Sequence, residues 1–291
     1  MATHEKNNIR RSIALDRTGS WVLNKQFPSD VIVQVGERCF NLHKFMLVAK
    51  SNYIRKLILE AKKADLTMID LSGIPGGAET FEKAAKYCYG VNFEITVHNV
   101  AALRCAAEYL QMSDEYSKHN LISRTNDFLE QVALSSLSGA IAVLKSCEEL
   151  LPMAEDLQIV SRCVDSISFK VCKEASFPST SPANWWTEEL SVLNVMVFGK
   201  IINAMRKRGA KASSIASALI TYAERSLRDL VRDHSGRGTK DSDVGASEEG
   251  NKQREILEIL VALSPADKSC FPVNFLCCLL RCAIFLKAST S

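Results

Sequence analysis

A hydrophobic residue recurs at every second position from residue 31 onward, and this period of two is typical of a β-strand. Valines occupy every second position of residues 31–35. Gly36 and Glu37 then interrupt the run, and apolar residues return at Cys39, Phe40 and Leu42. Two β-branched and aromatic runs that flank a two-residue turn containing glycine predict a β-hairpin.

The spacing of apolar residues changes to three or four after Leu42, as in an amphipathic helix. The positions that share one face of this helix or helix pair are Phe45, Met46, Ala49, Tyr53, Leu57 and Ile58. Residues 66–71 return to strand character, and the Gly- and Pro-containing stretch 73–77 predicts a loop.

Two further helices are predicted before residue 112. The first should end at Gly90, which suits a helix C-cap. Its inward positions are Phe81, Ala84, Ala85 and Cys88. The second should begin at Thr96, a good N-cap residue, and its many alanines predict close packing against neighbouring helices. Residues 28–118 are therefore predicted to form an α+β domain with a small sheet flanked by short helices.

The rest of the chain has helical periodicity, which predicts an all-α region after the α+β domain. The Ser- and Pro-rich composition of residues 176–184 indicates a linker. Residues 232–252 are Gly, Ser and charged residues with almost no apolar side chain, which predicts a disordered loop. The predicted divisions are an N-terminal tail and edge segment (1–27), the α+β domain (28–118), linking helices (119–175), the linker (176–184) and a second helical domain (185–291).

Composition limits the classes of function. The 291 residues, 47% of them hydrophobic, can bury the core of one large or two ordinary domains. A net charge of +3 gives no electrostatic reason to expect nucleic acid as the main partner. The ten cysteines form no C-x-x-C pair and several lie in apolar helical patterns, so we expect buried, reduced thiols rather than disulfides or a zinc site.

No set of residues predicts catalysis. Asp30 and His43 could be two members of a triad, but no serine or cysteine is placed to complete it. The Pro-Gly-Gly sequence at 75–77 lacks the lysine and the spacing of a phosphate-binding loop. We therefore expect a non-enzyme with no catalytic residue, no cofactor and no metal. Trp185 and Trp186 fit either an exposed hot spot for a partner or, with more weight, a packing role.

Several motifs occur in the order found in one known family. Ser29-Asp30-Val31, Phe40-Asn41-Leu42-His43-Lys44, Tyr87-Cys88-Tyr89-Gly90 and Ala107-Glu108-Tyr109-Leu110 resemble the hallmarks of a BTB/POZ domain. Residues 74–81 and 99–112 are similar to the plant non-phototropic-hypocotyl, or phototropic-response, family. Further similarity to this family lies in residues 120–123, 157–163, 185–186 and 271–276.

The resemblance implies a substrate-recruiting adaptor of a cullin-3-type RING ubiquitin ligase, acting in phototropic and auxin-linked signalling. Ile58 and Glu60 match the hydrophobic-x-Glu form that some BTB adaptors use to contact the cullin, although chance could also produce three such residues. The linking helices would extend this contact. Asp30 and His43 match buried polar positions near the dimer interface of BTB domains. The implied partners are therefore a cullin and a second BTB chain, either identical or from a related family member.

An alternative with the same fold is a dimeric scaffold that binds phototropin-type kinases without ligase activity. A transcription cofactor is disfavoured, because neither zinc-finger spacing nor a basic DNA-binding helix is present. The implied location is the cytoplasm or the periphery of the plasma membrane. Ser12, which follows Arg10-Arg11, resembles a site for basophilic kinases, although an ordinary solvated tail carries more weight.

The resemblance covers only the first part of the second domain, because family members continue beyond the position of Ser291 through more helices. The apolar helix that ends near Leu286 is too short to span a membrane and carries Arg281. We expect part of its apolar surface to lack the helices that would cover it, and this would favour self-association and limit solubility. The residues concerned are Leu279, Leu280, Ile284 and Phe285.

Overall fold

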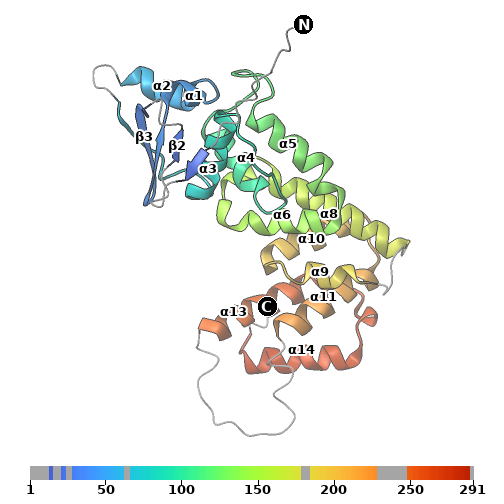
Figure 1. Ribbon diagram of the computed structural model, residues 1–291. Coiled ribbons are helices and arrows are strands. Elements are labelled where there is room, and N and C mark those ends of the chain that lie inside the picture. Colours follow the sequence, from blue (N-terminus) through green and yellow to red (C-terminus); the bar gives the residue numbers. More distant parts are fainter. Residues whose placement is uncertain are drawn as a thin grey trace. The chain divides into compact units, whose positions relative to one another are not determined.

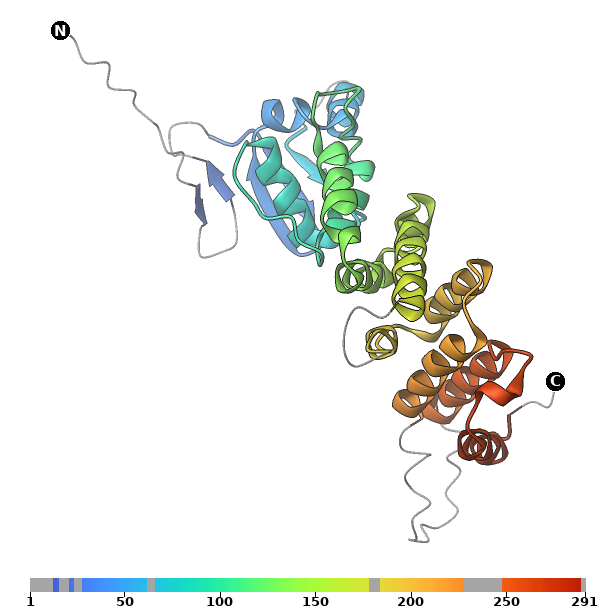
Figure 2. The same cartoon turned by 90° about the vertical axis from the view of Figure 1, so that its right-hand side faces the viewer.

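The computed structural model describes residues 28–61, 66–177, 184–227 and 248–288, and the backbone of two short strands at 13–15 and 21–23. Figures 1 and 2 show the elements from two directions. The chain divides into two compact units. Unit 1 contains Met1–Ala133 and Ser146–Ile159, and unit 2 contains Leu134–Lys145 and Val160–Ser291. Strands occur only in unit 1 among the described residues, which confirms the predicted fold class of an α+β domain followed by an all-α region.

A three-stranded sheet with the order β4-β3-β5 organises unit 1. Strand β3 (Val31–Val35) pairs antiparallel with β4 (Arg38–Leu42) and parallel with β5 (Met68–Asp70). The predicted hairpin is confirmed: the register pairs Val35 with Arg38, and Gly36 has the positive φ of 59° that such a tight turn favours. The alternating valines of β3 are buried, as their period of two predicts.

Two strands lie outside this sheet. Strand β1 (Ile13–Leu15) and strand β2 (Trp21–Leu23) pair antiparallel with one another. The apolar edge segment at 21–23 therefore forms a two-stranded sheet with a neighbouring part of the N-terminal region, rather than adding a strand to the three-stranded sheet.

The helical stretch after β4 is divided into α1 (Lys44–Val48) and α2 (Asn52–Glu60). The single apolar face predicted for this stretch is partly wrong. Because Ser51 starts a new helix, the stripe does not continue across the break, and Phe45 and Ala49 are exposed. Leu47 supplies the buried contact of α1 instead.

Helix α3 (Gly77–Cys88) ends as the sequence predicts. Gly90 has a φ of 65° and its N–H donates to the carbonyl of Tyr87, while Val91 N–H donates to the carbonyl of Lys86. This pair of bonds is a Schellman motif with Gly90 just beyond the C-cap. Helix α4 (Val100–Tyr109) begins later than predicted, because Thr96 starts a preceding turn whose carbonyl accepts from Val100 N–H.

The remaining helices alternate between the two units. Helix α5 (Leu121–Gln131), the 3₁₀ turns η1 (Ala133–Ser135) and η2 (Glu148–Leu150), and α7 (Met153–Asp156) lie wholly or partly in unit 1. Helices α6 (Leu137–Ser146) and α8 (Ile159–Ser176) contribute almost all their residues to unit 2. The linking helices predicted for 119–175 are therefore shared between the units.

Unit 2 is a helical assembly around the side chains of Trp186, Phe198 and Tyr222. Its other elements are α9 (Trp186–Leu190), α10 (Val195–Lys207), α11 (Ala212–Ser226), α13 (Glu248–Ala262), η4 (Lys268–Cys270) and α14 (Val273–Phe285). The loop predicted for 232–252 is wrong at its C-terminal end, because residues 248–252 belong to helix α13. Glu248 and Glu249 occupy its first turn, where negative charge favours a helix N-terminus.

Candidate protein-binding surface

Helix α2 is fixed at its N-terminal end by a buried serine. Ser51 Oγ accepts a hydrogen bond from Ile54 N–H at 3.2 Å and donates to the carbonyl of Leu110 at 2.7 Å. The first bond caps α2 and the second joins it to the end of α4. Lys56 and Asn52 each donate to Gln111 Oε1 at 3.0 Å. The helix is therefore held at a defined orientation on unit 1.

The two predicted cullin-contact residues, at the C-terminal end of α2, differ in how exposed they are. Glu60 is exposed, but Ile58 is half-buried and packs against the core of unit 1. Leu59 lies between them and is 64% exposed. The structure thus brings Ile58 and Glu60 to one end of α2 but makes Leu59 the accessible apolar side chain. The helical spacing could have identified Leu59, because it lies off the face that carries Ile54, Leu57 and Ile58.

His43 is buried, as predicted, just before α1. Tyr89 Oη accepts from His43 N–H at 2.7 Å and lies 3.1 Å from His43 Nδ1. Burial raises the pKa of Tyr89 to about 12, so the phenol stays protonated at neutral pH. His43 therefore fixes the start of α1 to the end of α3.

Asp30, in contrast, is exposed in the single chain, and its place near a dimer interface stays a prediction. Asp30 Oδ1 accepts a hydrogen bond from the first N–H of α1, that of Lys44, at 2.7 Å. The hairpin register places Asp30 beside the end of β4, where Asp30 N–H donates to the carbonyl of Leu42. The carboxylate of Asp30 therefore lies close to the start of α1. Asp30 thus caps α1 from the position just before β3.

Unit 1 also exposes apolar residues on its sheet and on α1. Ile32 and Met68 are paired across β3 and β5 and are 38% and 55% exposed, on the sheet face opposite the buried valines. Phe45 on α1 is 65% exposed, and its ring centroid lies 5.8 Å from that of His43. Exposed apolar side chains of this size suit contacts with another protein chain.

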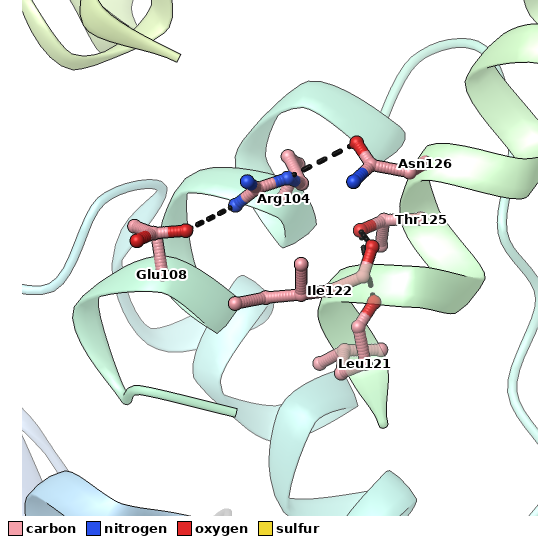
Figure 3. A network of polar contacts seen from close by, with 6 residues as sticks. All are labelled: Arg104, Glu108, Leu121, Ile122, Thr125 and Asn126. Carbon is pink, nitrogen blue, oxygen red and sulfur yellow. Dashed lines mark hydrogen bonds and ion pairs between the residues drawn. The ribbon is translucent and has the colours of Figure 1, made fainter. Parts of the chain in front are cut away.

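A polar network joins α4 to α5 (Figure 3). Arg104 forms an ion pair with Glu108 one turn along α4, at 2.8 Å, and donates from Nε to Asn126 Oδ1 on α5 at 3.2 Å. Thr125 Oγ1 donates back to the carbonyls of Leu121 and Ile122 within α5. Arg104 is largely covered, so its charge is partly desolvated and its partners matter for holding α5 on unit 1.

The paired tryptophans of unit 2 have separate environments. Trp186 is fully buried in α9, which favours the packing role over a hot spot for this residue. Trp185 is half-buried, and its Nε1 donates to Glu174 Oε1 at 3.3 Å. The apolar surface predicted for the last helix is largely exposed: Leu280 and Ile284 are 62% and 70% accessible, while Leu279 is half-buried.

The ten cysteines are free thiols in the structure, and within the described ranges no three His, Cys, Asp or Glu side chains are grouped so as to hold a metal. Burial raises the pKa of Cys88 and of Cys163 to about 12. Cys39 and Cys277 are exposed, so burial does not extend to every thiol.

Iodoacetamide at about pH 8 is expected to alkylate Cys39 and Cys277 of the native protein and to leave Cys88 and Cys163 unmodified. Only the thiolate reacts, and a thiol with a pKa near 12 is ionised to about one part in ten thousand at that pH. Peptide mass spectrometry measures the modified fraction, with guanidinium-unfolded protein as the fully reactive control. Comparable labelling of buried and exposed thiols in the native protein would contradict the described packing.

The candidate phosphorylation site Ser12 and most of the predicted loop, residues 232–247, lie outside the described residues. No helix within the described ranges has the length and apolar character needed to cross a bilayer.

Comparison with known proteins identifies both units. Residues 22–131 match the BTB/POZ domain and residues 184–291 match the NPH3 family. Root phototropism protein 2 of Arabidopsis thaliana is 63% identical over 99% of this chain and 50% of its own length. The BTB/POZ domain-containing proteins SR1IP1 and SETH6 of the same plant are 42% and 38% identical over 96% and 98% of this chain, and 49% and 46% of their own lengths. The chain thus spans about half the length of the curated relatives it matches.

Proposed function

Because the chain belongs to the NPH3 family of BTB/POZ-domain proteins, we propose that it is a substrate-recruiting adaptor of a cullin-3-type RING ubiquitin ligase. A BTB/POZ domain is a protein-interaction domain, and the protein would bind the cullin through unit 1 and a target through unit 2. The name of the relative Root phototropism protein 2 supports a role in phototropic signalling. The proposed location is the cytoplasm or the periphery of the plasma membrane.

The observation that carries this proposal is the end of α2. Leu59 and Glu60 are adjacent and exposed, and hydrogen bonds at Ser51 hold the same helix against α4. A rigid helix that presents one apolar and one acidic side chain can place both in a complementary site with little loss of conformational freedom. Ile58 would act indirectly, because it anchors the helix end to the core.

Changing Leu59 and Glu60 together to alanine is expected to weaken binding to the N-terminal region of a cullin-3 protein by about tenfold or more. Binding of the full chain can be measured by calorimetry or pull-down. Met68→Ala is a matched control, because it removes a similarly exposed apolar side chain from β5 and should leave the affinity unchanged. Ile58→Ala is less informative, since the loss of a core contact would also lower stability.

Equal binding by the wild type and the double variant would place the cullin contact elsewhere on unit 1. If the folded wild type does not bind a cullin at all, the adaptor function fails. A dimeric scaffold for phototropin-type kinases then becomes the better function. The exposed apolar pair of Ile32 and Met68 favours that second function, because it offers a surface for association with an identical or related BTB chain.

A further inference from the structure

Unit 1 contains a pocket of about 260 Å³ that lies apart from the exposed end of α2. Its walls come from the turn after α1, the end of α3 and the segment that follows it, and α5. The lining residues are Lys50, Tyr87, Gly90, Val91, Asn92, Phe93 and Arg124. The Schellman motif at Gly90 turns the chain so that residues 91–93 form one side of the pocket.

Two cations and two aromatic rings line this pocket. The guanidinium carbon of Arg124 lies 5.5 Å from the ring centroid of Tyr87 and 6.0 Å from that of Phe93. Lys50 Nζ lies 5.7 Å from the Tyr87 centroid. The rings stand nearly perpendicular to one another, at 89°, with their centroids 6.4 Å apart. These cation–π contacts restrict the positions of both charged groups before any ligand binds.

Neither cation forms an ion pair within the described part of the chain. Lys50 donates to Ser117 Oγ at 2.9 Å, which is a neutral acceptor, and no carboxylate forms an ion pair with Lys50 or Arg124. Tyr87 uses its hydroxyl to donate to the carbonyl of His119 at 2.8 Å, so the ring is fixed as well. Burial raises the pKa of Tyr87, and the phenol therefore stays neutral beside the cations.

We propose that this pocket binds a phosphorylated side chain of a partner protein. A phosphomonoester carries a charge of about −1.5 to −2 at neutral pH and several strong acceptor oxygens, which match one arginine and one lysine. The aromatic walls would contact the carbon atoms that carry the phosphate. A singly charged carboxylate would leave one of the two cations uncompensated.

The surroundings favour a peptide over a membrane surface as the source of the phosphate. Asp114 and Asp127 are exposed on the loop before α5 and on α5 itself, so the two cations of the pocket do not continue into a basic surface on that side. A bilayer of anionic lipids attracts an extended basic surface, and these carboxylates would oppose it. A single phosphorylated side chain can enter the pocket without contacting Asp114 or Asp127, whereas a broad anionic surface would have to approach both. The inference does not depend on cullin binding.

The test uses the full chain and short alanine-based peptides whose central residue is phosphoserine, phosphothreonine or phosphotyrosine, without any cullin present. At least one phosphopeptide is expected to bind about tenfold or more tightly than its unphosphorylated and glutamate-containing twins. Calorimetry gives the affinity, and amide chemical shifts of residues 90–93 locate the site. Arg124→Gln is expected to reduce the affinity at least about tenfold, Lys50→Gln to reduce it less, and Arg124→Lys to restore part of it.

Lys118→Gln is the matched control, because it removes one positive charge from an exposed position outside the pocket and should leave the affinity unchanged. The proposal is wrong if the wild type binds every phosphopeptide no more tightly than its unphosphorylated twin. Equal binding of the glutamate twin would overturn the phosphate class, and preferential binding to vesicles containing phosphatidic acid would overturn the peptide source. Arg124→Gln with unchanged affinity and a native melting curve would remove the pocket as the site.

Discussion

Gly76→Ala is expected to destabilise the BTB/POZ unit by about 2–5 kcal/mol. Gly76 has a φ of 74°, which costs an L-residue about 1–2 kcal/mol. A Cβ at this position would also lie 2.4 Å from Thr80 Oγ1 and 2.8 Å from Ala102 Cβ. Ala102 belongs to α4 and cannot turn its methyl group away, so relief of this overlap requires α3 and α4 to separate, which adds about 1–3 kcal/mol. Denaturant unfolding followed by circular dichroism measures the loss.

Gly77→Ala separates the two causes. Gly77 also has a positive φ, 61°, but an added Cβ would meet no atom within 4 Å. This variant should therefore lose only the backbone contribution, about 1–2 kcal/mol. Equal losses in the two variants would show that the close approach of α3 to α4 at Gly76 does not contribute to stability.

The sequence correctly predicted those parts of unit 1 whose structure depends only on residues close together along the chain. The hairpin followed from alternating valines and a glycine turn, and the end of α3 followed from Gly90, because each needs only a few adjacent positions to specify its geometry. Phe45 was predicted to share one apolar face with residues of α2, because periodicity alone does not reveal that Ser51 caps a new helix. Ser51 ends the stripe by bonding to Leu110, far along the chain.

The candidate sites depended more strongly on distant contacts. The sequence suggested Ile58 and Glu60 as a cullin contact, and this stays a prediction. Which apolar side chain of the segment is accessible depends on the face that α2 turns to the core, and the structure exposes Leu59. The pocket at Arg124 could not be predicted, because Lys50, Tyr87 and Arg124 come from a turn and two helices that only the folded chain brings together.

The two surfaces of unit 1 differ in chemistry, and this difference bears on the proposed adaptor. The end of α2 is apolar and acidic, whereas the pocket at Arg124 is cationic and aromatic. One ligand chemistry cannot satisfy both surfaces, so binding at one need not compete chemically with binding at the other. An adaptor with this arrangement could hold a cullin through a constitutive contact and bind a second protein only after that protein is phosphorylated.

Trp186→Ala is expected to destabilise unit 2 by about 3–5 kcal/mol, which is comparable to the stability of many small domains. The indole is fully buried in α9, and its removal would leave a large cavity beside α11. Thermal melting monitored by circular dichroism should show the transition of unit 2 shifted to lower temperature. A variant that melts like the wild type would contradict the central position of Trp186 in this unit.

Trp186→Phe should lose much less stability than Trp186→Ala, about 1 kcal/mol or less, because two effects of the substitution oppose one another. Phenylalanine fills less volume and leaves a small cavity. It also removes Trp186 Nε1, a buried donor with no hydrogen-bond partner among the described residues. Burying such an unpaired donor lowers the stability of the folded state by about 1–3 kcal/mol. Trp185→Phe, the matched control, lacks this compensation, since it removes the bond to Glu174. A loss above about 3 kcal/mol in Trp186→Phe would mean that the indole N–H stabilises unit 2, contrary to the unpaired state described.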